Sequence, residues 1–277
     1  MKKIAMMLAA ALGMIGAEAQ LNTPSPSPLQ TIKQNFGLSF IELSYSRPGM
    51  KNRKVFGDLV PFGQVWRTGA NAATTLTFGD EVIIGGTKVP AGKYGLLSIP
   101  GEKEWTLIIS KQTDVTSPDD YKQDQDVVRI KANPASLPRS VETMVIAFEN
   151  IKGNSCDIGL SWESTYVSFP VSTDVDGKVM KQIDNIMNKD NRPYYQAASY
   201  YYDNGKDLSQ ALNWINKATE AAPNSMPWVH TLKTRILAKM GRKDDAIAAA
   251  KNAIRIANET KYTEFAKQNE EILKTLK

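Results

Sequence analysis

The stretch EVIIGGTKVPAGKYGLLSI, residues 81–99, carries the strongest structural signals of the chain. Gly85 and Gly86 separate two short runs rich in β-branched residues, a pattern typical of a tight β-hairpin. Tyr94 follows Pro90 by four residues, which resembles the tyrosine corner of immunoglobulin-like sandwiches. The stretch therefore predicts antiparallel β structure and favours a sandwich over a barrel.

The same two-residue periodicity extends in both directions, from Phe36 to Val171. We expect about nine or ten short strands with turn signals between them and no intervening helix, which is typical of an antiparallel β-sandwich, immunoglobulin-like or jelly-roll-like. Beyond the opening stretch, the clearest strand segments are IELSYS (41–46), TTLTF (74–78), VVRIKA (127–132), VETMVIAFEN (141–150), CDIGLSWE (156–163) and TYVSFPV (165–171).

The pattern changes to helical spacing after Pro170. ALNWINKATEAAP, which begins at Ala211, recurs in part as AIAAAKNAI from Ala246, an offset of 246 − 211 = 35 residues. This resembles the tetratricopeptide repeat, which has a period of about 34 residues. A last helix with apolar residues at Tyr262, Phe265, Ile272 and Leu276 is expected to cap the repeats. The fold class predicted is α+β in two domains.

The N-terminus has the three parts of a secretory signal peptide: the basic MKK, the apolar IAMMLAAALGMIGA, and the small-x-small sequence Ala17-Glu18-Ala19. We therefore expect a signal peptide at 1–19, a β-sandwich domain at 20–172 and a helical repeat domain at 173–277. The protein is expected to be periplasmic or secreted, with no transmembrane segment after signal removal.

Composition argues against several classes of function. A net charge of +5 is too low for a nucleic-acid binder, and nucleic acid is not expected as a partner. One cysteine and one histidine allow neither a disulfide nor a structural zinc site, so no metal or cofactor is expected. Cys156 and His230 are predicted to be packing residues, and no catalytic residue is assigned. A hydrolase that uses two carboxylates stays open, because the distance between two carboxylates depends on the fold and cannot be read from the sequence.

Residues 45–71, YSRPGMKNRKVFGDLVPFGQVWRTGAN, combine cations and aromatics with a single acid, Asp58. Arginine suits carboxylate, phosphate or sulfate, and tryptophan can stack on a sugar or another ring. We expect a ligand groove formed by Arg47, Arg53, Trp66, Arg67 and Asn71. The competing interpretation is architectural: Phe56, Phe62 and Trp66 fix a long loop to the core, while Arg47 and Arg67 bond Glu42, Asp58, Asp80 or backbone carbonyls.

Residues 46–110, with VWRTGANAATTLTF and VPAGKYGLLSIPGEKEWTLII as their most characteristic runs, and the later LSWESTYVSFPV resemble the bacterial family known as domain of unknown function 2911. The resemblance covers about residues 34–171. It implies export and, in some members, helical repeats behind the β domain. The family has no established activity, ligand or catalytic residue, so it assigns no role to any residue here.

The leading expectation is a non-catalytic binding or scaffolding protein of the cell envelope, whose repeats bind a partner protein or peptide. Tyr194 and Tyr201 are the candidate contact residues, because tyrosine is favoured at interfaces. The alternative for these tyrosines is packing within the protein. The alternative functions are a glycan- or anion-binding β-sandwich module and, third, a cryptic hydrolase.

Overall fold

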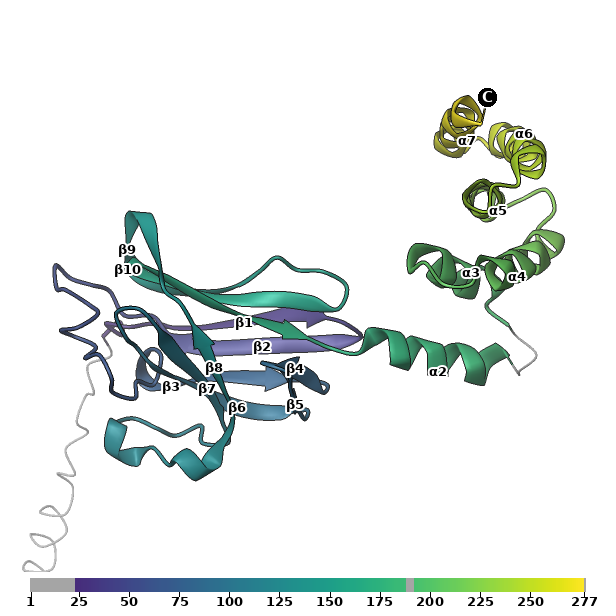
Figure 1. Cartoon of the computed structure of the whole chain (residues 1–277). Helices are drawn as coiled ribbons and strands as arrows, with labels where there is room; N and C mark the ends of the chain where they lie inside the picture. Colours follow the sequence, from purple (N-terminus) through teal and green to yellow (C-terminus); the bar gives the residue numbers. More distant parts are fainter. Residues whose placement is uncertain (1–22, 188–191, 277) are drawn as a thin grey trace, which may run out of the picture. The chain divides into compact units, whose positions relative to one another are not determined.

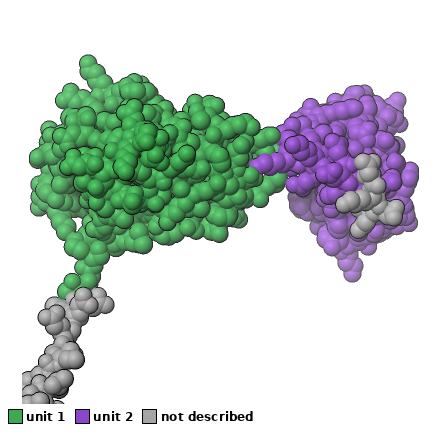
Figure 2. Space-filling model, turned by 90° about the horizontal axis from the view of Figure 1, so that it is seen from below, with its two compact units in different colours: residues 1–175 green, residues 176–277 purple. Residues whose placement is uncertain are grey.

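The computed structural model describes residues 23–187 and 192–276, and the predicted signal peptide lies outside them. The chain divides into two compact units, residues 1–175 and 176–277, which Figure 2 colours separately. The described strands belong to the first unit, and the second unit is helical (Figure 1).

The strands form two antiparallel sheets, which confirms the predicted sandwich class. The larger sheet has the order β1-β2-β3-β6-β7-β8, and the smaller has the order β5-β4-β10-β9. The bounds are β1 (Leu29–Phe36), β2 (Ser39–Ser46), β3 (Ala70–Phe78), β4 (Val82–Ile84), β5 (Thr87–Val89), β6 (Gly92–Ile99), β7 (Trp105–Ser110), β8 (Asp126–Ala132), β9 (Ala135–Glu149) and β10 (Ser155–Ser172).

Both local signals of the opening stretch are confirmed. Gly85 and Gly86 connect β4 to β5 with φ angles of 56° and 78°, and positive φ at both turn residues is the type I′ geometry that suits a two-residue hairpin. The hydroxyl of Tyr94 donates to the carbonyl oxygen of Pro90 at 3.0 Å. That bond fixes the corner at which the chain leaves β5 and enters β6.

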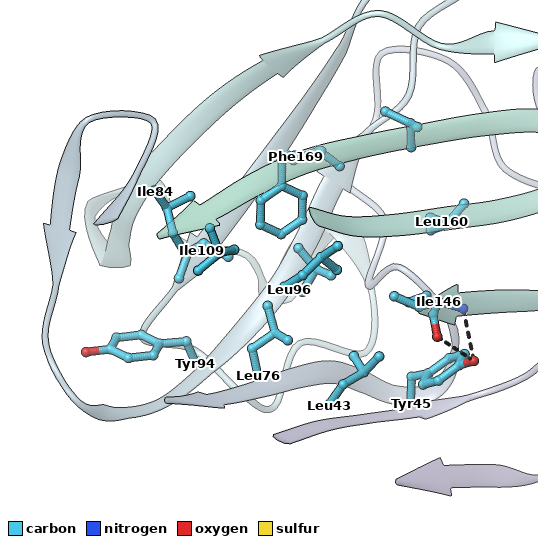
Figure 3. Close-up of a cluster of buried hydrophobic side chains, with 14 of the residues drawn as sticks. Leu43, Tyr45, Leu76, Ile84, Tyr94, Leu96, Ile109, Ile146, Leu160 and Phe169 are labelled. Atoms are coloured by element: carbon cyan, nitrogen blue, oxygen red, sulfur yellow. Dashed lines mark hydrogen bonds between the residues drawn. The ribbon is translucent and has the colours of Figure 1, made fainter. Parts of the chain in front are cut away.

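The core of the first unit lies between the two sheets (Figure 3). Alternate residues of β2 are buried there, as the period of two requires. Cys156 is also buried, which confirms its predicted packing role. The core side chains of Figure 3 come from both sheets and include Leu43, Leu76, Leu96, Ile146, Leu160 and Phe169.

The last part of the sandwich differs from the prediction. CDIGLSWE and TYVSFPV were expected as separate strands, but both belong to β10, which pairs with the equally continuous β9. The register between β9 and β10 shifts on both sides of Glu163, whose φ of 54° is left-handed. An irregularity of this kind absorbs extra residues without ending the strand, so no turn is needed.

The second unit contains six helices within the described residues. They are α2 (Val175–Met187), α3 (Tyr194–Asp203), α4 (Leu208–Ala221), α5 (Pro227–Lys239), α6 (Lys243–Glu259) and α7 (Thr263–Thr275). The side chain of Asp207 caps α4 by accepting a bond from the Ser209 amide at 2.8 Å. None of the described helices is long and apolar enough to cross a bilayer.

The residues with the 35-residue offset lie in this unit's interior. Ala211 of α4 and Ala246, Ala250 and Ala253 of α6 are all fully buried, and α6 packs on α5. Small residues at these positions allow close approach between helices. The tetratricopeptide-like repeat itself stays a prediction.

The predicted apolar face of the last helix is only partly correct. The buried residues of α7 are Ala266 and Asn269, whereas Tyr262 is 52% exposed. The helix begins at Thr263, so Tyr262 occupies the N-cap position, and its ring contacts Trp228 and Phe265 at the surface. The helical spacing was right, but the start of the helix turns Tyr262 away from the core.

Candidate functional site

The cation-rich stretch forms the connection between β2 and β3, and backbone bonds hold it on β6. The Trp66 amide donates to the Ser98 carbonyl at 2.7 Å, and the Ser98 amide donates back to Trp66 at 2.9 Å. The Gly63 amide donates to the Pro100 carbonyl at 2.8 Å. A loop anchored this way presents its side chains in fixed positions.

Four aromatic rings form one cluster under this loop. Phe56 contacts Trp66, Trp105 and Trp162 edge-on, with ring centroids 4.8–6.1 Å apart. Trp66 and Trp162 are stacked, 5.9 Å apart and inclined by 19°. The architectural interpretation is therefore confirmed for Phe56 and Trp66. It is wrong for Phe62, which is 37% exposed.

The connection between β7 and β8 approaches the loop from the other side. It contains two single-turn 3₁₀ helices, Pro118–Asp120 and Gln123–Gln125. The carboxylate of Asp120 accepts bonds from the Thr116 hydroxyl at 2.8 Å and from the Thr116 and Ser117 amides at 3.0 and 2.8 Å. These bonds lower the pKa of Asp120 to about 2. The side chain of Asp120 therefore stabilises the conformation of the loop to which it belongs.

A pocket of about 360 Å³ lies between the two connections. Its charged lining residues are the two arginines Arg53 and Arg67, and no Asp, Glu, His or Cys lines it. The remaining surface is mostly apolar. The lining residues are Ser27, Pro48, Arg53, Leu59, Val60, Pro61, Gln64, Val65, Trp66, Arg67, Gly69, Ala70, Thr116, Ser117, Pro118 and Trp162.

The guanidinium of Arg67 is only partly satisfied by the protein. Its Nη1 donates to the Thr116 carbonyl, which ties the loop to the opposite rim. Its Nε is buried and has no hydrogen-bond partner among the described residues, and Arg67 forms no ion pair with any of them. A buried charged donor without an acceptor is costly and calls for an explanation.

The backbone next to Arg67 is strained. Thr68 is fully buried with a left-handed φ of 54°, a conformation that β-branched residues rarely adopt. Its carbonyl accepts a bond from the Thr74 hydroxyl at 2.6 Å, and its own hydroxyl lies 2.9 Å from that of Ser98. Such strain costs on the order of 1–3 kcal/mol and is found mostly at functional sites.

Three of the five predicted ligand-binding residues meet at the pocket. Arg53, like Trp66 and Arg67, lines it; its Nε and Nη2 donate to the Met50 and Gly49 carbonyls at 2.9 Å each. Arg47 and Asn71 do not line it. Arg47 donates from Nε to the Met144 carbonyl at 3.0 Å, and Asn71 holds the Ser27 carbonyl at 3.2 Å.

The structure places both predicted contact tyrosines of the helical unit against its interior. The ring of Tyr201 packs edge-on against Trp214, with centroids 4.8 Å apart. Tyr194 is half-buried, and the ammonium of Lys217 lies 5.4 Å from its ring centroid. Packing, the alternative left open by the sequence, therefore describes Tyr201 best.

A second cavity, of about 310 Å³, lies in the helical unit beside His230. His230 is buried, and its Nε2 lies 2.8 Å from the Ala222 carbonyl oxygen, which confirms its predicted packing role. Elsewhere in the described ranges, no group of three or more His, Cys, Asp or Glu side chains is placed to hold a metal ion.

The sequence did not reveal the pocket's far side. Ser117 and Pro118 belong to the acid-rich segment SPDDYKQDQD (117–126), which resembles a solvated loop, and Thr116 directly precedes it. Trp162 has the spacing of a core residue in β10. The one available signal was Ser117 three residues before Asp120, a capping-box spacing that indicates an ordered turn.

Neither the curated proteins nor the solved structures contain a match to this chain. A model of one protein family matches residues 27–171, which include every strand from β1 to β9 and most of β10, and all of the pocket's lining residues. The match ends before the helical unit. The chain therefore belongs to the family described as "Protein of unknown function (DUF2911)".

Proposed function

We propose that the β-sandwich is a binding module for an anionic group, free or carried on a glycan, which it takes into the pocket beside Arg67. The observation that carries this proposal is the buried Nε of Arg67, a charged donor with no acceptor among the described residues. An anion in the pocket would supply that acceptor through a charge-assisted hydrogen bond.

The electrostatics of the lining agree with this proposal. Both charged lining residues are cations, and each is held by bonds to backbone carbonyls, which leave its positive charge in place. Binding is proposed rather than catalysis because the lining offers no carboxylate, imidazole or thiol for proton transfer or nucleophilic attack.

Thermal unfolding with simple anions tests the proposal. The probes are sulfate, phosphate, acetate and glucuronate at matched ionic strength, with wild type compared with Arg67→Met. Arg139→Met is the control, because the side chain of Arg139 on β9 is exposed and forms no ion pair with the described residues. A ligand that binds only the folded state raises the free energy of unfolding by RT ln(1 + [L]/Kd), and the unfolding temperature rises with it.

We expect at least one anion to stabilise wild type and Arg139→Met but not Arg67→Met. Equal stabilisation of all three proteins would show that the anions act on the general surface charge. The proposal would be contradicted if no probe raised the unfolding temperature at any probe concentration at which the protein stays soluble.

We also propose, as a second function, that the helical unit binds a partner protein or peptide of the cell envelope. The supporting observation is an aromatic cluster of Trp228, Tyr262 and Phe265, with ring centroids 5.9–6.5 Å apart, in which Tyr262 is 52% exposed. Large aromatic side chains at a surface are the usual anchors of protein interfaces.

Site-specific photocrosslinking in the native cell tests this second function. A photoreactive phenylalanine analogue at position 262 should yield one discrete adduct, which is lost when Trp228→Ala is added. The same analogue at the exposed position 251 on α6 is the control. Identical adducts from both positions would contradict a specific surface.

Export is part of the proposal, and its support is the signal-peptide pattern of residues 1–19. The mature protein purified from the native envelope should begin at Gln20. Recovery from the cytoplasm with an intact N-terminus would contradict it.

A further inference from the structure

The guanidinium of Arg67 has one edge that the protein leaves unused. Nη1 is anchored on the Thr116 carbonyl, whereas no described residue accepts a bond from Nε or Nη2. The N–H bonds of Nε and Nη2 lie in the guanidinium plane and point in parallel from one edge of the group. This two-donor edge matches the two oxygens of a carboxylate, which a single-point cation such as lysine cannot do.

The rest of the lining does not suit a ligand rich in hydroxyl groups. The uncharged polar side chains are those of Ser27, Gln64, Thr116 and Ser117, and the Thr116 hydroxyl already donates to Asp120. The indole N–H of Trp66 is also used, because it donates to the Gly69 carbonyl at 3.1 Å. Sugar hydroxyls in this pocket would lose water without gaining enough partners.

Apolar and aromatic side chains make up the remaining wall. Leu59, Val60, Pro61 and Val65 come from the loop, and the stacked pair Trp66 and Trp162 belongs to the aromatic cluster. The volume of about 360 Å³ lies near the small end of the roughly 300–1,000 Å³ typical of ligand pockets. The body of the ligand should therefore be small and apolar.

We propose that the ligand is a small monocarboxylic acid with a flat apolar body, whose carboxylate binds the Nε–Nη2 edge of Arg67 while its body lies against the aromatic wall. This inference rests on the proposed anion-binding function and narrows it, because it excludes a bare inorganic anion and a uronic sugar as the preferred ligand.

NMR titration tests the ligand class. The probes are phenylacetate, its neutral analogue phenylacetamide, glucuronate and sulfate. The resonances followed are the Nε–H of Arg67 and the indole N–H of Trp66. We expect phenylacetate to shift both resonances and to bind at least tenfold more tightly than each of the other three probes.

Variants of Arg67 test the geometry. Arg67→Met should abolish the phenylacetate response, and Arg139→Met should retain it. Arg67→Lys keeps the charge but lacks the two-donor edge, so it should weaken binding at least tenfold. The amide spectrum of each variant reports whether it folds, and the lysine variant provides the test if the methionine variant does not.

The outcomes separate the two proposals. If glucuronate or sulfate binds as tightly as phenylacetate and requires Arg67, the carboxylic-acid inference is wrong and the anion-binding function stands. If phenylacetamide binds as tightly as phenylacetate, the pocket is an apolar site and both proposals are wrong. Both also fail if none of the four probes shifts the Arg67 Nε–H. Unchanged binding to Arg67→Lys would refute the two-donor geometry.

Discussion

The hydroxyl of Tyr45 on β2 joins the two sheets of the sandwich through the backbone of Ile146 on β9 (Figure 3). It accepts a bond from the Ile146 amide at 2.9 Å and donates to the Ile146 carbonyl at 3.1 Å. Tyr45 is only 1% exposed, and its burial raises the pKa of the phenol. One side chain therefore satisfies both backbone groups of a residue at the sheet edge.

Tyr45→Phe should destabilise the protein by about 1–3 kcal/mol, because it leaves the Ile146 amide and carbonyl buried without this partner. Tyr94→Phe is the comparison, since it removes a single, partly buried bond to Pro90 and should cost about 1 kcal/mol or less. Urea unfolding measures both free energies. Equal losses would show that the two bonds from Tyr45 to Ile146 stabilise the fold no more than the single bond from Tyr94 to Pro90.

Gly95→Ala should be strongly destabilising. A Cβ at Gly95 would lie 2.1 Å from the carbonyl oxygen of Gln112, a backbone atom that can move only with the connection between β7 and β8. Gln112 begins the connection that forms the pocket rim, so the substitution should disturb the site as well. We expect the free energy of unfolding to fall by about 1–3 kcal/mol or more.

Gly153→Ala is the matched control for this substitution. Its added Cβ meets no atom within 4 Å, and its φ is not left-handed. The unfolding free energy should change by no more than about 0.5 kcal/mol. Similar losses at the two positions would mean that the contact with the Gln112 carbonyl does not set the cost.

The rim should respond to acid through Asp120. Because the folded-state pKa of Asp120 is lowered to about 2 from the ordinary 3.8, the stability that its bonds contribute is complete above about pH 4 and is lost as the pH falls from 3.8 through about 2. The carboxyl carbon of Asp120 should titrate in NMR with a midpoint near 2. The Thr116 and Ser117 amide resonances should follow it, and Asp120→Asn should abolish their response. A midpoint near 3.8 would contradict the bonds.

The sequence was sufficient for features that depend on neighbouring residues. Gly85-Gly86 and the Pro90–Tyr94 spacing specify local backbone geometry, and alternation places Leu43 and Tyr45 in the core whatever they face. Helical spacing likewise identified the buried Ala211 and Ala246. These features need no knowledge of distant contacts.

The pocket could be only half predicted, because its other half comes from elsewhere in the chain. Arg53, Trp66 and Arg67 lie in one loop, and their composition identified them. Thr116 and Trp162 reach the pocket through the order of strands in the two sheets, which periodicity does not encode. Arg47 has the same composition signal as Arg67, yet its partner is the Met144 carbonyl of β9.

The helical unit contains a buried polar contact between Asn269 and Thr231. The stability lost with this contact should depend on whether one or both side chains are replaced. Asn269 is fully buried; its Nδ2 donates to the Thr231 hydroxyl at 2.8 Å and to the Phe265 carbonyl at 2.7 Å. Its Oδ1 is buried and has no partner among the described residues. Thr231→Val should therefore cost about 1–2 kcal/mol, because it leaves an Asn269 donor underused beside an acceptor that is already unsatisfied.

Adding Asn269→Leu to Thr231→Val should restore part or all of that stability. The double variant replaces both partners by apolar groups of similar size, so no buried polar atom of this pair is left without a partner. A double-mutant cycle by urea unfolding measures the coupling between the two positions, which are in direct contact and should not be additive. If the double variant is less stable than Thr231→Val by the full cost of the single Asn269→Leu change, the two side chains contribute independently. The polar pair would then contribute to stability despite its unsatisfied oxygen, and the orphaned Oδ1 would have to be satisfied by water in solution.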